Sequence, residues 1–291
     1  MDWFTLALIS AVLSAAASIL EKKSLFTYDA LEFSFILSAF NLLFSLPFFF
    51  YVDYSALTAS ALLVLFVKSV MGVLAFWCVM LALKNLEISG ALPLMVLTPG
   101  LVAFLAFLFL GESLSPLEIA GMFLLLSGTY ILEMKVEESM LHPFRVFLNS
   151  KSHHYILFAL LLFTVTSLLD KALLSRFRMT PYSFMAFQQL FFALIFMAIF
   201  LFKNRSLRIN PSLFSVNWYI LALIGIFTIG YRYTQIESVK IAPVALVLSV
   251  KRISVFIAAI GGGRIFREQS LLKKAIATII LIAGAVLILD E

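Results

Sequence analysis

The run Ile241–Phe266, IAPVALVLSVKRISVFIAAIGGGRIF, carries two adjacent cations, Lys251 and Arg252, near the middle of an otherwise apolar stretch. A helix rises about 1.5 Å per residue, which places Lys251 roughly 15 Å from Ile241, about half of a bilayer core. A cation at that depth costs several kcal/mol unless it faces a partner, a cavity or a ligand. The pair is therefore predicted to line a polar site inside a membrane protein. The alternative is structural, in which the pair binds backbone carbonyls or extends to the membrane surface.

The composition supports a membrane protein. The chain has 291 residues, of which 63% are hydrophobic and only 13% charged, whereas a soluble domain is about half apolar and a quarter charged. We therefore expect an all-α integral membrane protein with many spans, in the cell (inner) membrane and surrounded by the lipid bilayer. The net charge of +5 is attributed to individual loops and predicts no nucleic-acid partner. Cys78 cannot form an intrachain disulfide, since it is the one cysteine.

Hydropathy along the chain predicts ten transmembrane helices joined by short polar connections. The longest connection runs from residue 134 to 153 and is expected to lie along the membrane interface. The predicted helices cover residues 3–20, 30–51, 59–83, 89–110, 116–133, 154–173, 182–202, 214–236, 241–265 and 271–289.

The two halves of the chain resemble each other. Ser18–Lys22, SILEK, matches Ser167–Lys171, SLLDK, at a shift of 149 residues. A shift of 156 residues later aligns three further pairs: Lys84 with Lys240, Glu112 with Glu268, and Gly128 with Gly284. Five helices per half is an odd number, so the halves must have opposite orientations, as in transporters with inverted repeats and a midplane site. We expect repeats at 1–134 and 154–291, with a linker at 135–153.

Two segments carry a family resemblance. The first is FLGESLSP, residues 109–116, followed by GMFLLLSGTYIL, and the second is IFREQS, residues 265–270, followed by IATIILIAGAVLIL. Both resemble the EamA repeats of the drug/metabolite transporter superfamily. The resemblance covers the whole chain and implies a ten-helix fold with alternating access around a central cavity. It implies no particular substrate, because that superfamily carries amino acids, drugs, sugars, nucleotide sugars and phosphorylated metabolites.

The segment around Lys251 and Arg252 is also similar to the Lys-Arg motif of plastid triose-phosphate and related sugar-phosphate transporters. The similarity implies that these two residues bind an anion, with Tyr231 or Tyr233 beside it. Those transporters carry a further lysine four residues before a proline in their fourth helix, where this chain has Met95. A doubly charged phosphate would therefore lack one of its ligands.

Charge placement gives two further expectations. The side opposite the termini carries most of the loop lysines and arginines, so the positive-inside rule favours termini outside the cell, whereas the superfamily resemblance implies termini in the cytoplasm. The 16 acidic residues fall in loops or near span ends. The acids nearest a span interior are Glu21, Glu32, Asp170 and Glu237, and for Glu21 and Asp170 we favour interfacial positions over gate ion pairs. The absence of a deep carboxylate favours exchange or facilitated flux over carboxylate-linked proton coupling.

Other polar residues inside predicted spans are weaker site candidates. Lys68 either joins the cavity or extends to the membrane surface, and Arg232 is either a ligand or an interfacial anchor. Gln188, Gln189 and Asn41 must find hydrogen bonds, either from a substrate or from a neighbouring helix.

The sequence shows no nucleotide-binding glycine loop, metal-ligand cluster or nucleophile–base arrangement, so we expect no cofactor, no metal and no enzyme activity. The predicted function is a secondary active or facilitative transporter of a small anionic or zwitterionic metabolite. One alternative is an exporter of amino acids or amphipathic compounds. A second is a non-transporting membrane receptor or assembly protein. Oligomeric state does not follow from the sequence.

Overall fold

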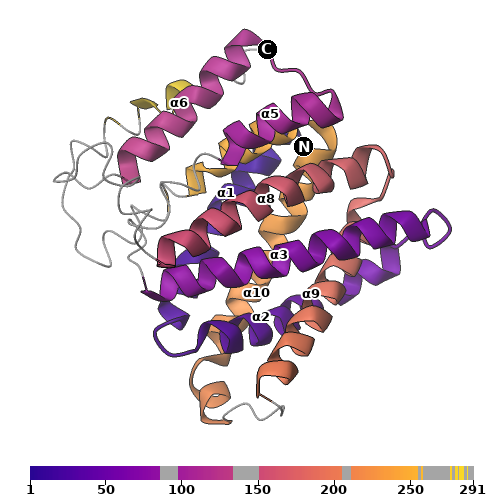
Figure 1. Cartoon of the computed structure of the whole chain (residues 1–291), viewed down its shortest axis with the longest axis vertical. Coiled ribbons are helices and arrows are strands. Elements are labelled where there is room, and N and C mark those ends of the chain that lie inside the picture. The colour runs from indigo at the N-terminus through magenta and orange to yellow at the C-terminus, as the bar shows by residue number, and fades with distance from the viewer. Residues whose placement is uncertain are drawn as a thin grey trace.

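The computed structural model describes residues 1–85, 98–133, 151–204 and 211–254, together with 257, 276, 279–280, 282–284 and 287. Throughout these residues the regular structure is helical (Figure 1). The elements are α1 (Trp3–Ser24), α2 (Ala30–Ser45), the 3-10 helix η1 (Leu46–Tyr51), α3 (Ala59–Asn85), α5 (Thr98–Leu110), α6 (Pro116–Glu133), α8 (Lys151–Ser175), α9 (Pro181–Asn204), α10 (Pro211–Ile241) and α11 (Val244–Lys251).

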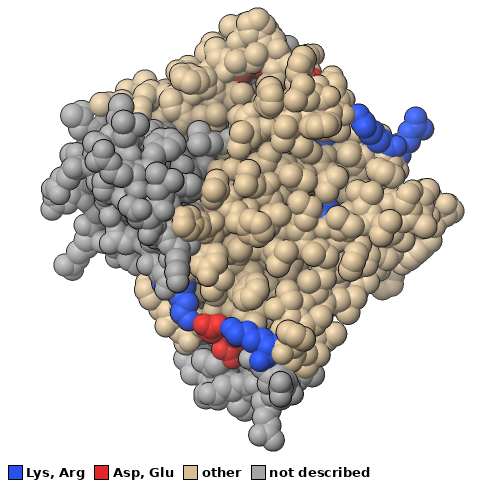
Figure 2. All heavy atoms as spheres, viewed as in Figure 1, with Lys and Arg blue, Asp and Glu red and all other residues tan. Residues whose placement is uncertain are grey.

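Five of the helical segments are long and apolar enough to cross a membrane: Trp3–Ser24, Ala30–Tyr51, Ala59–Lys84, His154–Ser175 and Pro181–Lys203. Two shorter apolar helices cover Thr98–Leu110 and Pro116–Gly128. The face seen in Figure 2 is broadly uncharged, with most of its lysine, arginine and acidic side chains at the margins. This surface suits lipid, and the chain is an integral membrane protein. The expected ten spans are not all established, because 271–289 lies largely outside the described residues.

The local sequence determines where α6 begins. Ser115 and Glu118 form a capping box at α6, in which Ser115 Oγ accepts from Glu118 N at 3.1 Å and Glu118 Oε2 accepts from Ser115 N at 2.8 Å. Pro116 occupies the first helical position, where its missing N–H costs nothing. Just before this start, Gly111 has a φ of 71°, which a residue without a Cβ adopts freely. The FLGESLSP segment therefore encodes a sharp turn followed by a capped helix.

The packing of the helices reflects the internal repeat. The most extensive contacts join α1 to α10 and α3 to α8, and Figure 1 shows α8 and α3 side by side. The shifts of 149 and 156 residues relate α1 to α8 and α3 to α10, so the two pairs are equivalent. Their lysines bond alike: Lys22 Nζ donates to Leu83 O, and Lys171 Nζ donates to Val239 O at 2.9 Å. The repeat is thus present in tertiary contacts as well as in sequence.

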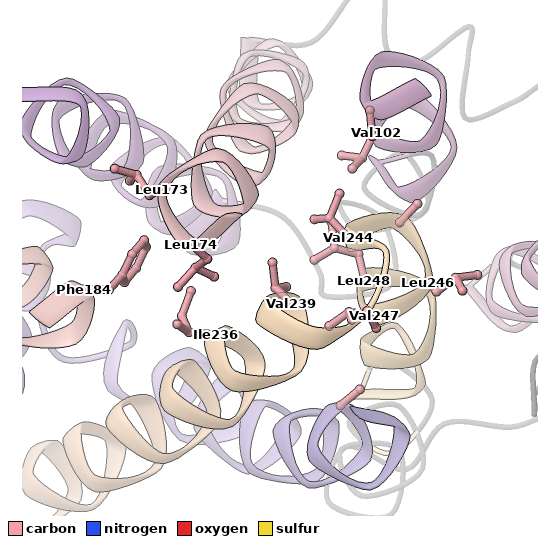
Figure 3. Close-up of a cluster of buried hydrophobic side chains, with 14 of the residues drawn as sticks. Val102, Leu173, Leu174, Phe184, Ile236, Val239, Val244, Leu246, Val247 and Leu248 are labelled. Atoms are coloured by element: carbon pink, nitrogen blue, oxygen red, sulfur yellow. The ribbon is translucent and has the colours of Figure 1, made fainter. Parts of the chain in front are cut away.

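Around α11 lies the largest described cluster of buried apolar side chains (Figure 3). Every residue from Val244 to Val250 is buried, and α5, α8, α9 and α10 contribute Val102, Leu173, Phe184 and Ile236. Lipid tails are as apolar as these side chains, so the cluster stabilises the fold through close packing more than through removal from water. The packing fixes the position of the short helix that ends at Lys251.

The boundary between the eighth and ninth predicted helices is wrong. The sequence placed spans at 214–236 and 241–265, whereas α10 continues to Ile241 and α11 begins at Val244. Pro243 causes the break, because proline lacks an N–H and its ring clashes with the preceding turn. α11 is interrupted after Lys251, where Arg252 is in a turn conformation, and Ile253 and Ser254 are again helical. Most of the remainder of the predicted span lies outside the described residues.

Replacing Gly284 by alanine is expected to destabilise the protein by about 2 kcal/mol, as overpacking does. An added Cβ would lie 2.7 Å from Gly121 O and 2.9 Å from Leu125 N, which are backbone atoms of α6. Gly100→Ala is the matched control, since its Cβ would meet only Leu126 Cδ1 at 3.9 Å. Thermal unfolding in detergent should show a lower Tm for Gly284→Ala alone. Equal Tm values for the two variants would contradict the close contact.

Candidate functional site

A cavity of about 290 Å³ lies among helices of both halves. Its walls come from α1, α2, α3, α5, α8, α9, α10 and α11. The volume is near the lower end of the range of about 300–1,000 Å³ that small-molecule sites occupy. Its polar walls include four cations, Lys68, Arg232, Lys251 and Arg252, and two carboxylates, Glu21 and Asp170. The cavity is therefore large enough for a small metabolite and rich in charge.

Most of the residues singled out from the sequence meet in this cavity. Lining residues from that set are Lys251, Arg252, Gln188, Gln189, Tyr231, Lys68 and Asn41. Tyr233 is the exception, because its ring stacks on Phe48 at 5.4 Å and on Tyr182 at 5.8 Å, away from the lining. Between the two tyrosines that the resemblance left open, Tyr231 is therefore the one on the cavity wall. That these residues contact substrate remains a prediction.

At the centre of the site, Asp170 bridges two cations. Its Oδ1 lies 2.8 Å from Lys68 Nζ and its Oδ2 lies 3.4 Å from Arg232 Nη2. The side chains of Lys68 and Asp170 are only 3% and 5% exposed, so each charge depends on the other. Arg232 Nη2 also donates to Gln188 Oε1 at 3.0 Å, and the Lys68 ammonium lies 4.8 Å from the centroid of the Phe184 ring.

Lys251 has a different environment, in which its close contacts are uncharged. Its ammonium donates to Gln235 Oε1, which also accepts from Arg232 Nη1 at 3.3 Å. It also lies 4.6 Å from the centroid of the Tyr231 ring, a cation–π contact. No carboxylate of the described residues forms a salt bridge with Lys251. Among the described residues the ammonium is therefore held by a neutral amide and an aromatic ring rather than by a direct ion pair.

The expectation that acids lie only at the membrane interface is wrong for Glu21 and Asp170. They are 6% and 3% exposed and both line the cavity. Their helices extend past the predicted ends at 20 and 173 to Ser24 and Ser175. Neighbours on a helix point about 100° apart, so Asp170 enters the cavity while Lys171 turns away to bind Val239 O and Ala242 O.

Sequence reasoning missed Gln235 and left Arg232 undecided between a ligand and an interfacial anchor. Arg232 lies well inside α10, because that helix continues to Ile241 rather than ending at 236. Thr228, Tyr231, Arg232 and Gln235 all line the cavity. Their spacing of three or four residues puts them on one helix face. This polar stripe in an apolar helix is the sequence signal that identifies them.

An aromatic cluster packs outside the cavity lining. Tyr233 stacks on Phe48 and Tyr182, and Tyr51 lies 5.4 Å from Tyr182 between ring centroids. These rings come from η1, the start of α9 and the last third of α10. Along α3, by contrast, the lining runs from Lys68 to Leu83, toward the C-terminal end of that helix. The four aromatic side chains are therefore packed beside the helices that form the cavity without lining it.

Glu112 stabilises the start of α11. Its Oε2 accepts from Val244 N at 3.1 Å, and its Oε1 lies 3.3 Å from Lys171 Nζ. The same lysine donates to Ala242 O at 2.8 Å. Glu112 thus supplies an acceptor to a free helix N-terminus, and Lys171 supplies a donor to the carbonyls at the end of α10.

Comparisons with known proteins agree with this architecture. The model of the EamA-like transporter family matches residues 1–134 and 151–290. The chain belongs to the EamA-like transporter family. A solved structure described as "Crystal structure of protein" superimposes on this EamA-like chain with a TM-score of 0.71 at 16% identity, covering 99% of this chain and 97% of that one. It shows a shared fold. No curated protein matches the chain significantly.

Replacing Lys68 by methionine is expected to cost about 3 kcal/mol, because it removes one of the two cations that neutralise the buried Asp170. Lys84→Met is the matched control. Lys84 forms an exposed pair with Asp29 at 2.6 Å, with side chains 38% and 54% exposed, and its hydrogen bond lowers the pKa of the Asp29 carboxyl. Exposed pairs contribute at most about 1 kcal/mol. Melting curves in detergent should therefore separate the two variants, and similar Tm losses would contradict a buried ion cluster.

Glu112→Ala is expected to destabilise the protein by about 2 kcal/mol, because Val244 N loses its acceptor and Lys171 loses its carboxylate. Glu112→Gln should lose less stability than Glu112→Ala, since its amide oxygen can still accept from Val244 N. Chemical or thermal unfolding gives the order of stability, wild type above Gln above Ala. If both variants unfold like wild type, the described contacts of Glu112 do not stabilise α11.

Proposed function

We propose that the chain is a secondary active or facilitative transporter that moves a small anionic or zwitterionic metabolite across the cell membrane by alternating access. In this proposal ten helices form two inverted five-helix repeats, 1–134 and 154–291, joined by an interfacial linker at 135–153. Family membership supports a membrane transporter. The cavity, lined by helices of both halves, supports a substrate site at their interface.

The charge of the cavity is the observation that supports the proposed class of substrate. Four cations line it against two carboxylates, and Asp170 is already committed to Lys68 and Arg232. Lys251 bonds to the neutral Gln235. A desolvated cation needs a counter-charge, so a substrate carboxylate or other singly charged anion suits Lys251 and Arg252. Gln188, Gln189 and Asn41 would then hydrogen-bond its polar groups.

Alternating access is part of this proposal. The cavity lies between helices of both halves, and transport by this mechanism requires two states in which the cavity opens to opposite sides of the membrane. A substrate that binds both states with equal affinity does not shift the equilibrium between them. Net movement must therefore be driven by a gradient of substrate or of a coupled ion.

Export of amino acids or amphipathic compounds is the second candidate, because the cavity also has an apolar wall. That wall includes Phe76, Met80, Phe163, Phe192 and Phe196. In this case Lys251 and Arg252 hold a carboxylate while the aromatic side chains contact an apolar group. A non-transporting receptor with the same fold is distinguished by the absence of flux in proteoliposomes.

The test is thermal stability of the purified protein in detergent against phosphorylated, carboxylate, zwitterionic, neutral and cationic metabolites. A ligand at 100 times its Kd stabilises a protein by about 2.7 kcal/mol. We expect carboxylate-bearing compounds to raise the Tm of wild type, and Lys251→Gln and Arg252→Gln to lose this response. Compounds that raise the Tm of wild type but not of the two variants should then show saturable flux in proteoliposomes.

The surface variant Lys84→Gln is the control, since Lys84 lies outside the cavity lining and should respond like wild type. Stabilisation by neutral or cationic compounds alone would refute an anion site. A normal anion response in both helix variants would show that Lys251 and Arg252 are structural.

A further inference from the structure

Glu21 and Asp170 hold equivalent positions in the two halves, but their surroundings differ. Both are buried and both line the cavity. Asp170 is neutralised by Lys68 at 2.8 Å and Arg232 at 3.4 Å. Within the described part of the chain, Glu21 forms neither a salt bridge nor a side-chain hydrogen bond. A buried carboxylate without such partners is costly in its ionised form.

The repeat explains why Glu21 lacks these partners. The shift of 156 residues between α3 and α10 makes Ile224 the counterpart of Lys68, and Phe76 the counterpart of Arg232. Ile224 is fully buried in an apolar cluster, and Phe76 lines the cavity. The side chains that would neutralise Glu21 by symmetry are therefore apolar.

Glu21 and Lys251 line the same cavity. α1, which carries Glu21, packs against α10 and α11, and these two helices with the residue after α11 bring Tyr231, Arg232, Lys251 and Arg252 to the cavity. The Lys251 ammonium lies 4.6 Å from the centroid of the Tyr231 ring. Asp170 is already paired with Lys68 and Arg232. Of the two carboxylates among the described lining residues, Glu21 is therefore the one left to balance Lys251.

We propose that Glu21 binds a proton when an anion occupies Lys251, so that the protein moves one proton together with each singly charged anion. The inference rests on the proposed function. A bound anion takes over the charge of Lys251, and Glu21 then lies buried without a counter-charge. Protonation of the carboxylate removes that cost. By linkage, proton binding at Glu21 strengthens anion binding by the same factor.

Charge balance favours this arrangement. One negative charge from the substrate and one positive charge from the proton leave the net charge of the cavity unchanged. The loaded and the empty cavity then carry the same charge when the protein changes state, so the membrane potential does not oppose the loaded step. The proton enters from the side to which the cavity is open, and it leaves with the anion on the other side.

A substitution tests the link between Glu21 and Lys251 without a substrate. Lys251→Gln imitates permanent neutralisation of the lysine, so its folded state should bind a proton at Glu21 that the unfolded chain releases near neutral pH. Stability then rises as the pH falls from neutral toward the ordinary carboxyl range of about 4 to 5. We expect the Tm of Lys251→Gln to rise on acidification by several degrees more than that of wild type.

Two further variants make this result decisive. Lys251→Gln combined with Glu21→Gln should lose the extra rise, whereas Lys251→Gln combined with Glu32→Gln should keep it, because Glu32 lies outside the cavity lining. The proposal is overturned if the Tm of Lys251→Gln depends on pH as that of wild type does. It is also overturned if the extra rise in Tm persists when Glu21→Gln is added.

Proton uptake gives the second measurement, with lactate and pyruvate as singly charged probes added to the protein in weakly buffered detergent. A probe that stabilises wild type should be bound with uptake of one proton, and Glu21→Gln should bind it without uptake. Binding without uptake by wild type overturns the proposal. If neither probe stabilises wild type, the anion site of the proposed function fails for these compounds, and the pH profile of Lys251→Gln still decides the role of Glu21.

Discussion

The buried carboxylate of Asp170, held between Lys68 and Arg232, is the constraint on which the site depends. An ionised group at this depth is tolerated only with close counter-charges. α3 comes from the first half of the chain, while α8 and α10 come from the second, so the ion cluster ties the halves together at their interface. Gln188 Oε1 also accepts from Arg232 Nη2. Several polar residues of the cavity therefore bond to one another, while Asn41 Oδ1, Thr228 Oγ1 and Arg232 Nε are buried without a partner among the described residues.

The internal repeat is retained in the backbone contacts and lost in the cavity. Lys22 and Lys171 bond to equivalent carbonyls, those of Leu83 and Val239, and these contacts maintain the same helix arrangement in both halves. At cavity positions the halves diverge, as Lys68 and its counterpart Ile224 show. A symmetric framework thus carries an asymmetric site.

The sequence predicted the described helices and many of the charged and amide-bearing cavity residues because both depend on local composition. Apolar runs locate helices, and a polar residue in such a run must face a cavity or a neighbour, which brought Lys68, Gln188 and Lys251 to attention. How deeply each acidic side chain is buried among the helices was harder to predict. The ends of α1 and α8 are stabilised by tertiary bonds such as that from Lys171 to Ala242 O, and distance along the chain does not reveal them. Asp170 was therefore placed at the interface, although it lies at the centre of the site.

The interruption at Pro243 separates α11 from α10, so the direction of α11 is set by its own contacts. Its first turn is anchored by Glu112, and its last residue is Lys251. The rise from Val244 to Lys251 is roughly 10 Å, so a tilt of about 10° at the proline would move the end of the helix by roughly 2 Å. Because every residue from Val244 to Val250 is buried, such a tilt requires the neighbouring helices to move with α11. The position of the Lys251 charge is therefore coupled to the helix packing of both halves.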